Sequence, residues 1–247
     1  MERELSYDLH IHSCLSPCAD DDNTPNNLAG MGMLAGLGLM ALTDHNSSKN
    51  CPAFFKAAEK VGIIPVAGME LETSEDVHVV CLFPTLEDAL DFDEVVASRR
   101  LPIKNKPEVY GEQTIMDEDD NVIGSEELLL VVATTIPLDE VCGLCGEHNG
   151  VCYPAHVDRQ SNGIISILGD IPPDLPFSCA ELHDLSLADE LSAKYPALSR
   201  LMLLSSSDAH RLEDINDARH YIELASSPDN PDEVRKELIE RLKRGRV

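Results

Sequence analysis

Hydrophobic and polar positions alternate along this chain in a way that predicts strands and helices in turn. Residues 5–11 (LSYDLHI) alternate like a strand, and Thr24-Pro25 then offers an N-cap and a first helical residue for a helix that ends at Gly36 or Gly38. Short apolar runs predict buried strands, and apolar residues spaced three or four apart predict helices. Further strands are expected at residues 39–43, 63–69, 77–83, 151–155, 177–182, 201–205 and 220–224. Further helices are expected at residues 51–61, 85–98, 138–148, 164–168, 187–194 and 232–244.

This alternation predicts one α/β domain that spans residues 1–247. Seven or eight strands alternate with helices, and no linker or repeat divides them. Repeated βα units over this length favour a closed or distorted barrel. Residues 99–124 break the rhythm because they are polar, contain prolines and carry an acidic turn at residues 117–121 between short apolar runs. We expect a β-hairpin insertion there.

The charge of the chain limits the partners it can bind. Lysine and arginine number 19 and aspartate and glutamate 45, which gives a formal net charge of −26. Affinity for nucleic acids and anionic membranes comes mostly from basic side chains, so we expect neither stable nucleic-acid binding nor membrane binding. A site that reads one phosphate or a short nucleotide end stays possible, because metal ions can supply local positive charge.

The segment pattern also predicts a location in the cell. No run approaches the ~20 apolar residues that a transmembrane helix needs. The first residues, MERE, lack the basic and apolar regions of a signal peptide, so we expect a cytoplasmic protein. The 8 cysteines are then expected to be thiols or metal ligands rather than disulfides. Cys142-x-x-Cys145, followed by Cys152, resembles a redox or zinc motif, but its irregular spacing favours buried thiols.

Histidines gather at the expected strand ends, where barrel active sites are built. Six of the nine lie at or just beyond those ends: His10, His12, His45, His78, His156 and His210. Glu70 and Asp208 occupy similar places, and Asp8 precedes His10 as a candidate for orienting an imidazole. Each residue alone has an ordinary structural explanation, and a buried core histidine is the default for His78. Together they predict a site for two or three ions of zinc, manganese or iron, since one ion takes four to six ligands.

The ordered set DLHIHS, TDHN, GMELE, a strand histidine, PAH and SDAH resembles the PHP (polymerase and histidinol phosphatase) family. The resemblance implies a distorted, TIM-like (βα)7 barrel with a trinuclear metal cluster that hydrolyses phosphoesters. It implies one ion on His10, His12, Glu70 and Asp208. Glu70 then bridges to a second ion on His78 and His156, and a third ion takes His45, His210 and a ligand from the first loop.

The first loop is where this sequence departs from the family pattern. The loop HSCLSPCADDDNTP is longer than usual, and counting back from Thr24-Pro25 indicates Asp20 as the ligand. Asp21, Asp22 or Cys18 are alternatives. A set of oxygen and nitrogen ligands favours manganese or iron, whereas a cysteine favours zinc.

The chemistry of phosphoester hydrolysis suggests roles for these residues. A metal-bridging hydroxide near Glu70 is the expected nucleophile, and the third ion, at His45 and His210, is expected to hold phosphate oxygens. Arginine suits phosphate because it donates two parallel hydrogen bonds. The candidates are Arg159, Arg211 and, as a substrate lid, Arg99 and Arg100. Glu70, Asp208, His45 and Arg159 are expected to be catalytic.

The expected activity is that of a metal-dependent phosphatase or exonuclease. The substrate is a small nucleotide of the 3′,5′-bisphosphate type or a short 5′-phosphorylated oligonucleotide. A histidinol-phosphate-type phosphatase is the alternative within the family. An amidohydrolase-like enzyme that cleaves C–N bonds and a non-catalytic metal-binding scaffold are the alternatives of other classes.

Overall fold

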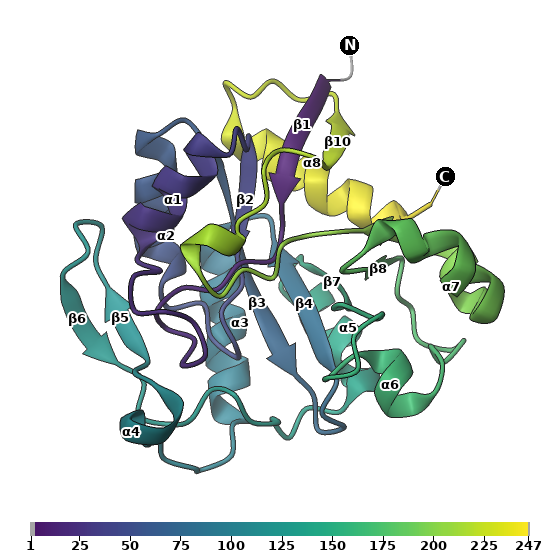
Figure 1. The fold of residues 1–247 in the computed structure, drawn as a ribbon, viewed down its shortest axis with the longest axis horizontal. Coiled ribbons are helices and arrows are strands. Elements are labelled where there is room, and N and C mark those ends of the chain that lie inside the picture. The colour runs from purple at the N-terminus through teal and green to yellow at the C-terminus, as the bar shows by residue number, and fades with distance from the viewer. Residues whose placement is uncertain (1–2, 247) are drawn as a thin grey trace.

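A six-stranded sheet forms the centre of the molecule in the computed structural model, which describes residues 3–246 (Figure 1). Its strands run in the order β10 (Tyr221–Leu224), β1 (Arg3–Asp8), β2 (Leu39–Leu42), β3 (Ile64–Glu72), β4 (His78–Phe83) and β7 (Val151–Pro154). Strands β1, β2 and β3 are parallel, whereas β4 is antiparallel to both β3 and β7. Strand β10 pairs antiparallel with β1.

A second, parallel pair of strands, β8 (Cys179–Glu181) and β9 (Met202–Leu204), continues the curl of this sheet. The segment after β7 contacts β8, where Val157 N donates to Glu181 O at 2.8 Å. The segment after β9 contacts the segment after β1, where Asp208 N donates to His10 O at 2.9 Å. These contacts place β8 and β9 between the segments that follow β7 and β1.

The distorted (βα)7 barrel is not confirmed, although the mixed α/β class is. Only a short turn joins β3 to β4, and so short a connection forces the two strands to run antiparallel. The hydrogen-bonded sheet stays open, because β8 and β9 form a separate pair. The sequence pattern placed no helix between these two strands, and none lies between β3 and β4.

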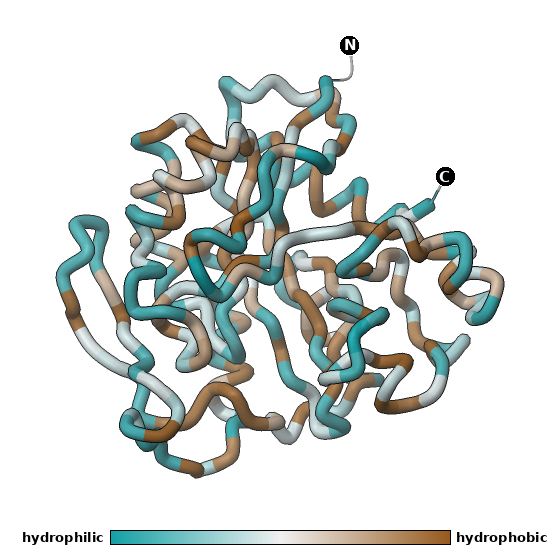
Figure 2. The backbone as a smooth tube through the Cα atoms, viewed as in Figure 1, coloured by the Kyte–Doolittle hydropathy of each residue, from teal (hydrophilic) through white to brown (hydrophobic). Residues whose placement is uncertain are grey.

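Helices cover both faces of the sheet, and alternate side chains on each strand feed two hydrophobic cores. On β2, Met40 and Leu42 face the core that contains α1 (Pro25–Leu34), α2 (Cys51–Lys60), α3 (Leu86–Ser98) and α5 (Leu138–Glu147). Leu39 and Ala41 face the core that α8 (Pro231–Arg244) covers. Hydrophobic stretches run through the central strands, and hydrophilic stretches occupy many of the outer loops (Figure 2).

The expected hairpin is present and projects from the body of the molecule. It consists of β5 (Thr114–Met116) and β6 (Val122–Ser125), after the short helix α4 (Pro107–Tyr110). The carboxylate of Asp120 at its tip accepts a hydrogen bond from Thr24 Oγ1 at 2.7 Å. The hairpin therefore contacts the start of α1 (Figure 1). The remaining helices, α6 (Ile164–Leu168) and α7 (Ala188–Lys194), lie where the sequence predicts them.

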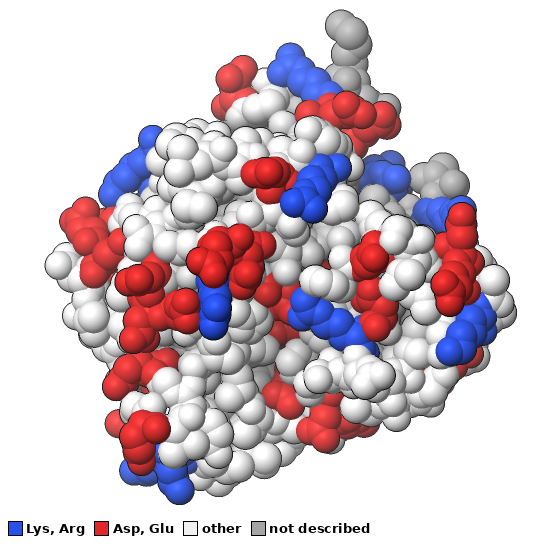
Figure 3. Space-filling model, viewed as in Figure 1, with Lys and Arg blue, Asp and Glu red and all other residues white. Residues whose placement is uncertain are grey.

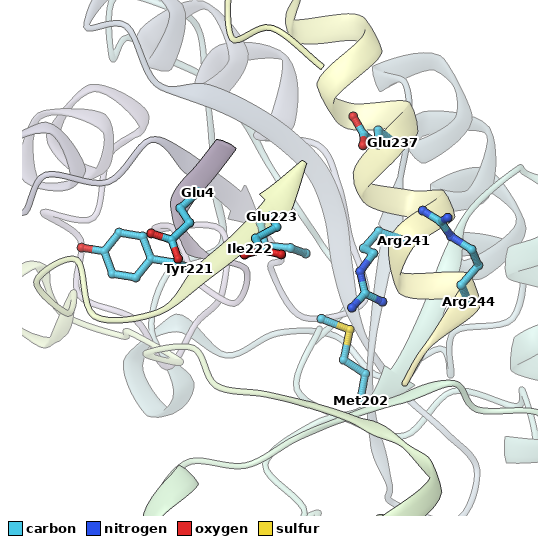
Figure 4. A pocket seen from close by; sticks show the side chains of 8 residues that line it. All are labelled: Glu4, Met202, Tyr221, Ile222, Glu223, Glu237, Arg241 and Arg244. Carbon is cyan, nitrogen blue, oxygen red and sulfur yellow. The ribbon is translucent and has the colours of Figure 1, made fainter. Parts of the chain in front are cut away.

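Two further observations concern the surface of the described residues. None of the helices within residues 3–246 combines the length and the apolar character that crossing a membrane requires. A cavity of about 500 Å³ lies between β10, β9 and α8, lined by Glu4, Met202, Tyr221, Ile222, Glu223, Glu237, Arg241 and Arg244 (Figure 4). It contains none of the residues that the sequence singles out for chemistry.

Candidate metal centre

The predicted histidines and carboxylates converge at one end of the sheet. His10 and His12 follow β1, His45 follows β2, Glu70 lies within β3, and His156 follows β7. Asp208 and His210 follow β9, and His78 is the first residue of β4. Because β4 runs antiparallel to β3, its beginning lies beside the end of β3. His78 therefore joins the site from the start of its strand, not from a carboxyl end as the sequence suggested.

His10 and His12 are placed by loop pairing rather than by a regular strand. The sequence predicted that the first strand reaches Ile11, but β1 ends at Asp8. Beyond it, Ile11 forms an isolated parallel bridge with Ala209, and His12 N donates to Ala209 O at 3.0 Å. This pairing aligns the His10–His12 segment with Asp208, which is far away in the sequence.

The first group of candidate ligands is His10, His12, Glu70 and Asp208, whose ligand atoms all lie within 4.8 Å of one another. The Nε2 atoms of His10 and His12 are 3.2 Å apart. His10 Nε2 lies 3.3 Å from Glu70 Oε1, and His12 Nε2 lies 3.2 Å from Asp208 Oδ1. Imidazole nitrogens and carboxylate oxygens at such distances could share a transition-metal ion.

Glu70 is the common member of the first group and of a second, which contains His45, Glu70 and His78. Glu70 Oε2 lies 3.0 Å from His45 Nδ1, and Glu70 Oε1 lies 2.9 Å from His78 Nδ1. The same Oε1 atom lies 3.1 Å from His156 Nε2. Glu70 thus contacts imidazoles from both groups and is placed to bridge two ions.

A third group contains only imidazoles: His12, His45 and His210. The first-loop residue Asp20 does not join it, because its side chain is 58% exposed and lies 3.8 Å from Arg211. The thiol of Cys18, from the same loop, lies within hydrogen-bonding reach of the His45 imidazole. Cys18 thus lies near His45, but like Asp20 it is exposed and does not belong to this group.

Burial makes the charges in this centre depend on one another. Burial alone would raise the pKa of Glu70, but His78, His10 and His45 hold it well below its usual range. Burial alone would lower the pKa of His10, but Glu181, Glu70 and Asp208 raise it well above its usual range. Each charged group is stabilised by its opposite, as in sites built for cations.

Three residues in the loops of the centre adopt left-handed backbone conformations that are unusual for side chains other than glycine. These are Asn46 with φ 48°, His156 with φ 28° and Asp208 with φ 51°. Such conformations cost ~1–2 kcal/mol each and persist where the surrounding contacts determine them, commonly at functional sites. The fold thus holds His156 and Asp208 in place against a backbone preference.

Glu181 is a supporting residue that sequence reasoning missed. It is the last residue of β8 and is 1% exposed. Its Oε1 accepts hydrogen bonds from His10 Nδ1 at 2.9 Å and from His156 N at 3.2 Å. The signal in the sequence was the position of Glu181 at the end of an expected strand, in CAELHD. Glu70 has the same kind of position.

Two other carboxylates, those of Asp44 and Asp8, accept hydrogen bonds from the loops that carry the histidines and Asp208. Asp44 accepts hydrogen bonds from Ser13 N and from Ser16 Oγ, both at 2.7 Å, and Ser16 Oγ lies 3.0 Å from His12 Nδ1. Asp8 does not contact an imidazole, contrary to the sequence prediction. Its carboxylate accepts a hydrogen bond from Ser207 N at 3.0 Å and so supports the loop that carries Asp208.

The four candidate arginines occupy different surroundings. Arg159 contacts the Asp208 carboxylate and lines the cavity of the metal centre. Arg211 is exposed beside Asp20. Arg99 binds Glu140 and Thr135 on the surface. Arg100 is buried and binds Asp93, Glu126 and Asn46 O, so its guanidinium is held within the fold and not in the cavity.

The centre opens into a cavity of about 130 Å³, lined by His45, Glu70, His78, His156, Arg159, Ser161, Asn162, Asp208 and His210. An arginine and several imidazoles thus surround a space suited to a small anionic group. His45 Nδ1 and Asp208 Oδ1 are buried and make no hydrogen bond within the described residues. Unpartnered buried polar atoms of this kind are expected where an ion belongs.

Several solved structures have a fold similar to that of this chain. A lesion-specific endonuclease from Pyrococcus furiosus is 20% identical with a TM-score of 0.57, and the match covers 90% of this chain and 52% of that one. The chain therefore spans about half of the endonuclease. An amidohydrolase from Chromobacterium violaceum, solved with bound sulfate, is 19% identical with a TM-score of 0.57, covering 89% and 92% of the two chains.

A protein from Bifidobacterium adolescentis assigned as a metal-dependent phosphoesterase is 16% identical with a TM-score of 0.52, and 96% and 97% of the two chains are covered. No curated protein matches this chain significantly in sequence. The PHP domain family matches residues 8–176, which is more than half of the chain and includes His10, Glu70 and His156. The chain therefore belongs to the PHP domain family.

Proposed function

We propose that this protein hydrolyses the phosphate ester of a small nucleotide, of the 3′,5′-bisphosphate type, or of a short 5′-phosphorylated oligonucleotide. The observation that carries the proposal is the contact of Glu70 with five imidazoles, those of His10, His12, His45, His78 and His156, beside a cavity that Arg159 also lines. Clustered nitrogen and oxygen ligands hold cations, and an arginine at the same cavity recognises a phosphate.

The donor set fits two or three divalent ions of manganese, iron or zinc. We assign His10, His12, Glu70 and Asp208 to one ion and Glu70, His78 and His156 to a second. His45 and His210 remain for a third. When bound, such ions offset the charge of the phosphate and make a coordinated water a nucleophile at neutral pH.

We propose that Cys18, rather than Asp20, completes the third site. His12 Nε2 can bind only one ion, so its use in the first site leaves His45 and His210 as the two imidazoles of the third. Cys18 contacts His45, whereas the Asp20 carboxylate faces Arg211 and solvent. Three protein ligands with one open position are typical of catalytic zinc.

The residues of this chain would divide the work of hydrolysis. Glu70 and Asp208 would supply negative charge to the ion sites. His45 would help to hold the third ion near the substrate. Arg159 contacts Asp208 in this structure and is free to donate to a phosphate oxygen once cations satisfy that carboxylate. Its 37% exposed side chain can reach an incoming substrate from the rim of the cavity.

The size and charge of the surroundings favour small substrates. The cavity of about 130 Å³ accepts a phosphate-sized group while the remainder of the substrate stays outside. Acidic side chains are spread over the face shown in Figure 3, with scattered basic side chains and no broad basic patch between them. A long nucleic acid depends on many basic contacts, so we infer that a short substrate is preferred.

We infer that the chain forms one domain, because both hydrophobic cores pack against the same sheet.

A direct experiment tests this proposal. The protein loaded with manganese is assayed against nucleoside 3′,5′-bisphosphates, short 5′-phosphorylated oligonucleotides, histidinol phosphate and a set of amides. We expect release of phosphate or of nucleotides from the first two classes, and a loss of at least 100-fold in His156→Ala. Activity on amides alone would support an amidohydrolase, and metal binding without any turnover would support a scaffold.

A matched control separates chemistry from folding. His220 belongs to none of the three ligand groups, so His220→Ala is expected to keep full activity. Full activity in His156→Ala would contradict the assignment of the centre.

A further inference from the structure

Four of the cysteines gather between α5 and the sheet, outside the three candidate metal groups. Cys142 and Cys145 lie one turn apart on α5, Cys152 lies on β7, and Cys81 lies opposite Cys152 on β4. The Cys145 thiol lies close to the thiols of both Cys81 and Cys152. These contacts form a chain of thiols that runs from the helix into the sheet.

The outermost pair of this chain is the closest. Cys142 Sγ lies 3.1 Å from Cys152 Sγ. This is about 1 Å longer than a disulfide bond, so a small movement of the two side chains would bring the sulfur atoms to bonding distance. Cys142 is partly exposed, whereas Cys81, Cys145 and Cys152 are 0%, 1% and 5% exposed. An oxidant in solution therefore reaches Cys142 first.

The arrangement of the four sulfur atoms favours a disulfide between two of them over a metal site. A tetrahedral zinc site requires several thiolates around one point. Among residues 3–246, no three of these sulfur atoms lie within 4.8 Å of one another. A linear chain with one short contact does meet the requirement of a disulfide, which joins only two sulfurs.

We propose that Cys142 and Cys152 form a reversible disulfide, an oxidative modification site separate from the metal centre. With oxidised glutathione as the oxidant, the Cys142 thiolate attacks one glutathione sulfur and releases one glutathione. Cys152 then attacks the Cys142 sulfur of the mixed disulfide and releases the second. Two protein thiols are oxidised, one glutathione disulfide is reduced, and the two protons pass to the two glutathione thiols.

The surroundings also set the speed of this reaction. The close contact with Cys152, together with burial, raises the pKa of the Cys142 thiol. Thiolate is the attacking species, so the disulfide forms slowly at neutral pH and faster as pH rises. The bond ties α5 to β7, whose last residue lies two positions before His156.

The test uses the full chain, reduced and then equilibrated in glutathione buffers of increasing oxidised fraction. Free thiols are blocked with an alkylating agent, and unreduced peptides are identified by mass spectrometry. We expect one peptide pair, linked through Cys142 and Cys152, that disappears on reduction and is missing in Cys142→Ser. Cys51→Ser, which removes a buried thiol elsewhere, is expected to leave the linkage unchanged.

Other results would overturn the proposal. These are the absence of a linkage in the most oxidising buffer, a linkage through Cys145 instead of Cys142, or one zinc ion bound with all four thiols protected. Cys142→Ser alters a partly exposed position, and circular dichroism checks that it folds. The readout contains no enzymatic assay, so it succeeds or fails independently of the proposed phosphoesterase activity.

Discussion

His10 Nδ1 donates a hydrogen bond to Glu181 Oε1 over 2.9 Å. This contact fixes the imidazole ring so that its other nitrogen, Nε2, points at Glu70 Oε1, 3.3 Å away, and at Asp208 Oδ1, 3.4 Å away. A carboxylate behind a ligating histidine sets its tautomer and raises its basicity. Glu181 therefore prepares His10 to bind a cation without touching the cation itself.

The substitution Glu181→Gln should weaken metal binding while the fold is kept. Because glutamine keeps the shape but removes the charge, we expect a loss of about 10–100-fold in metal affinity. A fluorescence or calorimetric titration with manganese measures the change. Glu223→Gln, at an exposed position of β10, serves as the control and should leave the affinity unaltered. Unchanged affinity in Glu181→Gln would remove Glu181 from the supporting set.

Arg159 should act on substrate binding. Replacement by alanine removes the one arginine among residues 3–246 that lines the cavity, so we expect KM for a phosphorylated substrate to rise about 10-fold or more, in line with the strength of charge-assisted hydrogen bonds. Arg159→Lys should recover only part of this loss, because lysine cannot donate two parallel hydrogen bonds. Steady-state kinetics of the wild-type protein and of each variant, with the same phosphorylated substrate, provide the measurement. Arg211→Ala, on the exposed side of the site, is the comparison.

Cobalt substitution should reveal the ligand from the first loop. With Cys18 as a ligand, the cobalt-loaded protein absorbs in the near ultraviolet by charge transfer from thiolate to metal. This band should vanish in Cys18→Ser and persist in Asp20→Asn and in Cys142→Ser. Persistence of the band in Cys18→Ser, or its absence from the wild-type protein, would return the assignment to an oxygen ligand such as Asp20.

The neighbouring arginines Arg99 and Arg100 should differ in their effect on stability. The Arg100 side chain is 3% exposed and faces Asp93 and Glu126, and Lys49 also pairs with Glu126, so Arg100→Ala leaves the buried Asp93 carboxylate without its ion pair and should cost ~3–5 kcal/mol. Arg99 is 35% exposed beside Glu140, and Arg99→Ala should cost under ~1 kcal/mol. Urea unfolding monitored by circular dichroism compares the two. Equal losses would contradict the structural role of Arg100.

Metal ions should stabilise the folded chain. The centre holds buried carboxylates and imidazoles at short distances, and a cation that binds only the folded state adds about 2.7 kcal/mol at one hundred times its Kd. Thermal unfolding should therefore move to higher temperature with manganese and to lower temperature with a chelator. His78→Ala should show a smaller shift than the wild type. A melting temperature that changes with neither manganese nor chelator would argue against the metal centre.

Much of the fold was accessible from local sequence patterns. The N-cap at Thr24, whose side chain accepts a hydrogen bond from Asn27 N, starts α1 where the sequence predicts it. The acidic turn at residues 117–121 closes a hairpin for the same reason, since turn residues and short apolar runs act locally. The (βα)7 barrel is not confirmed, because strand direction depends on the connection, and only a turn separates β3 from β4.

The sequence by itself determined which side chains can bind cations and that they follow strands, because strand ends and residue chemistry are both local properties. Tertiary structure alone decided which of them meet. It placed Glu181 behind His10, moved Arg100 into the fold, turned Asp20 outward and brought Cys142 to Cys152. Distances between segments far apart in the chain depend on how the sheet curls and on which strands reverse, and the pattern of neighbouring residues does not encode these directly.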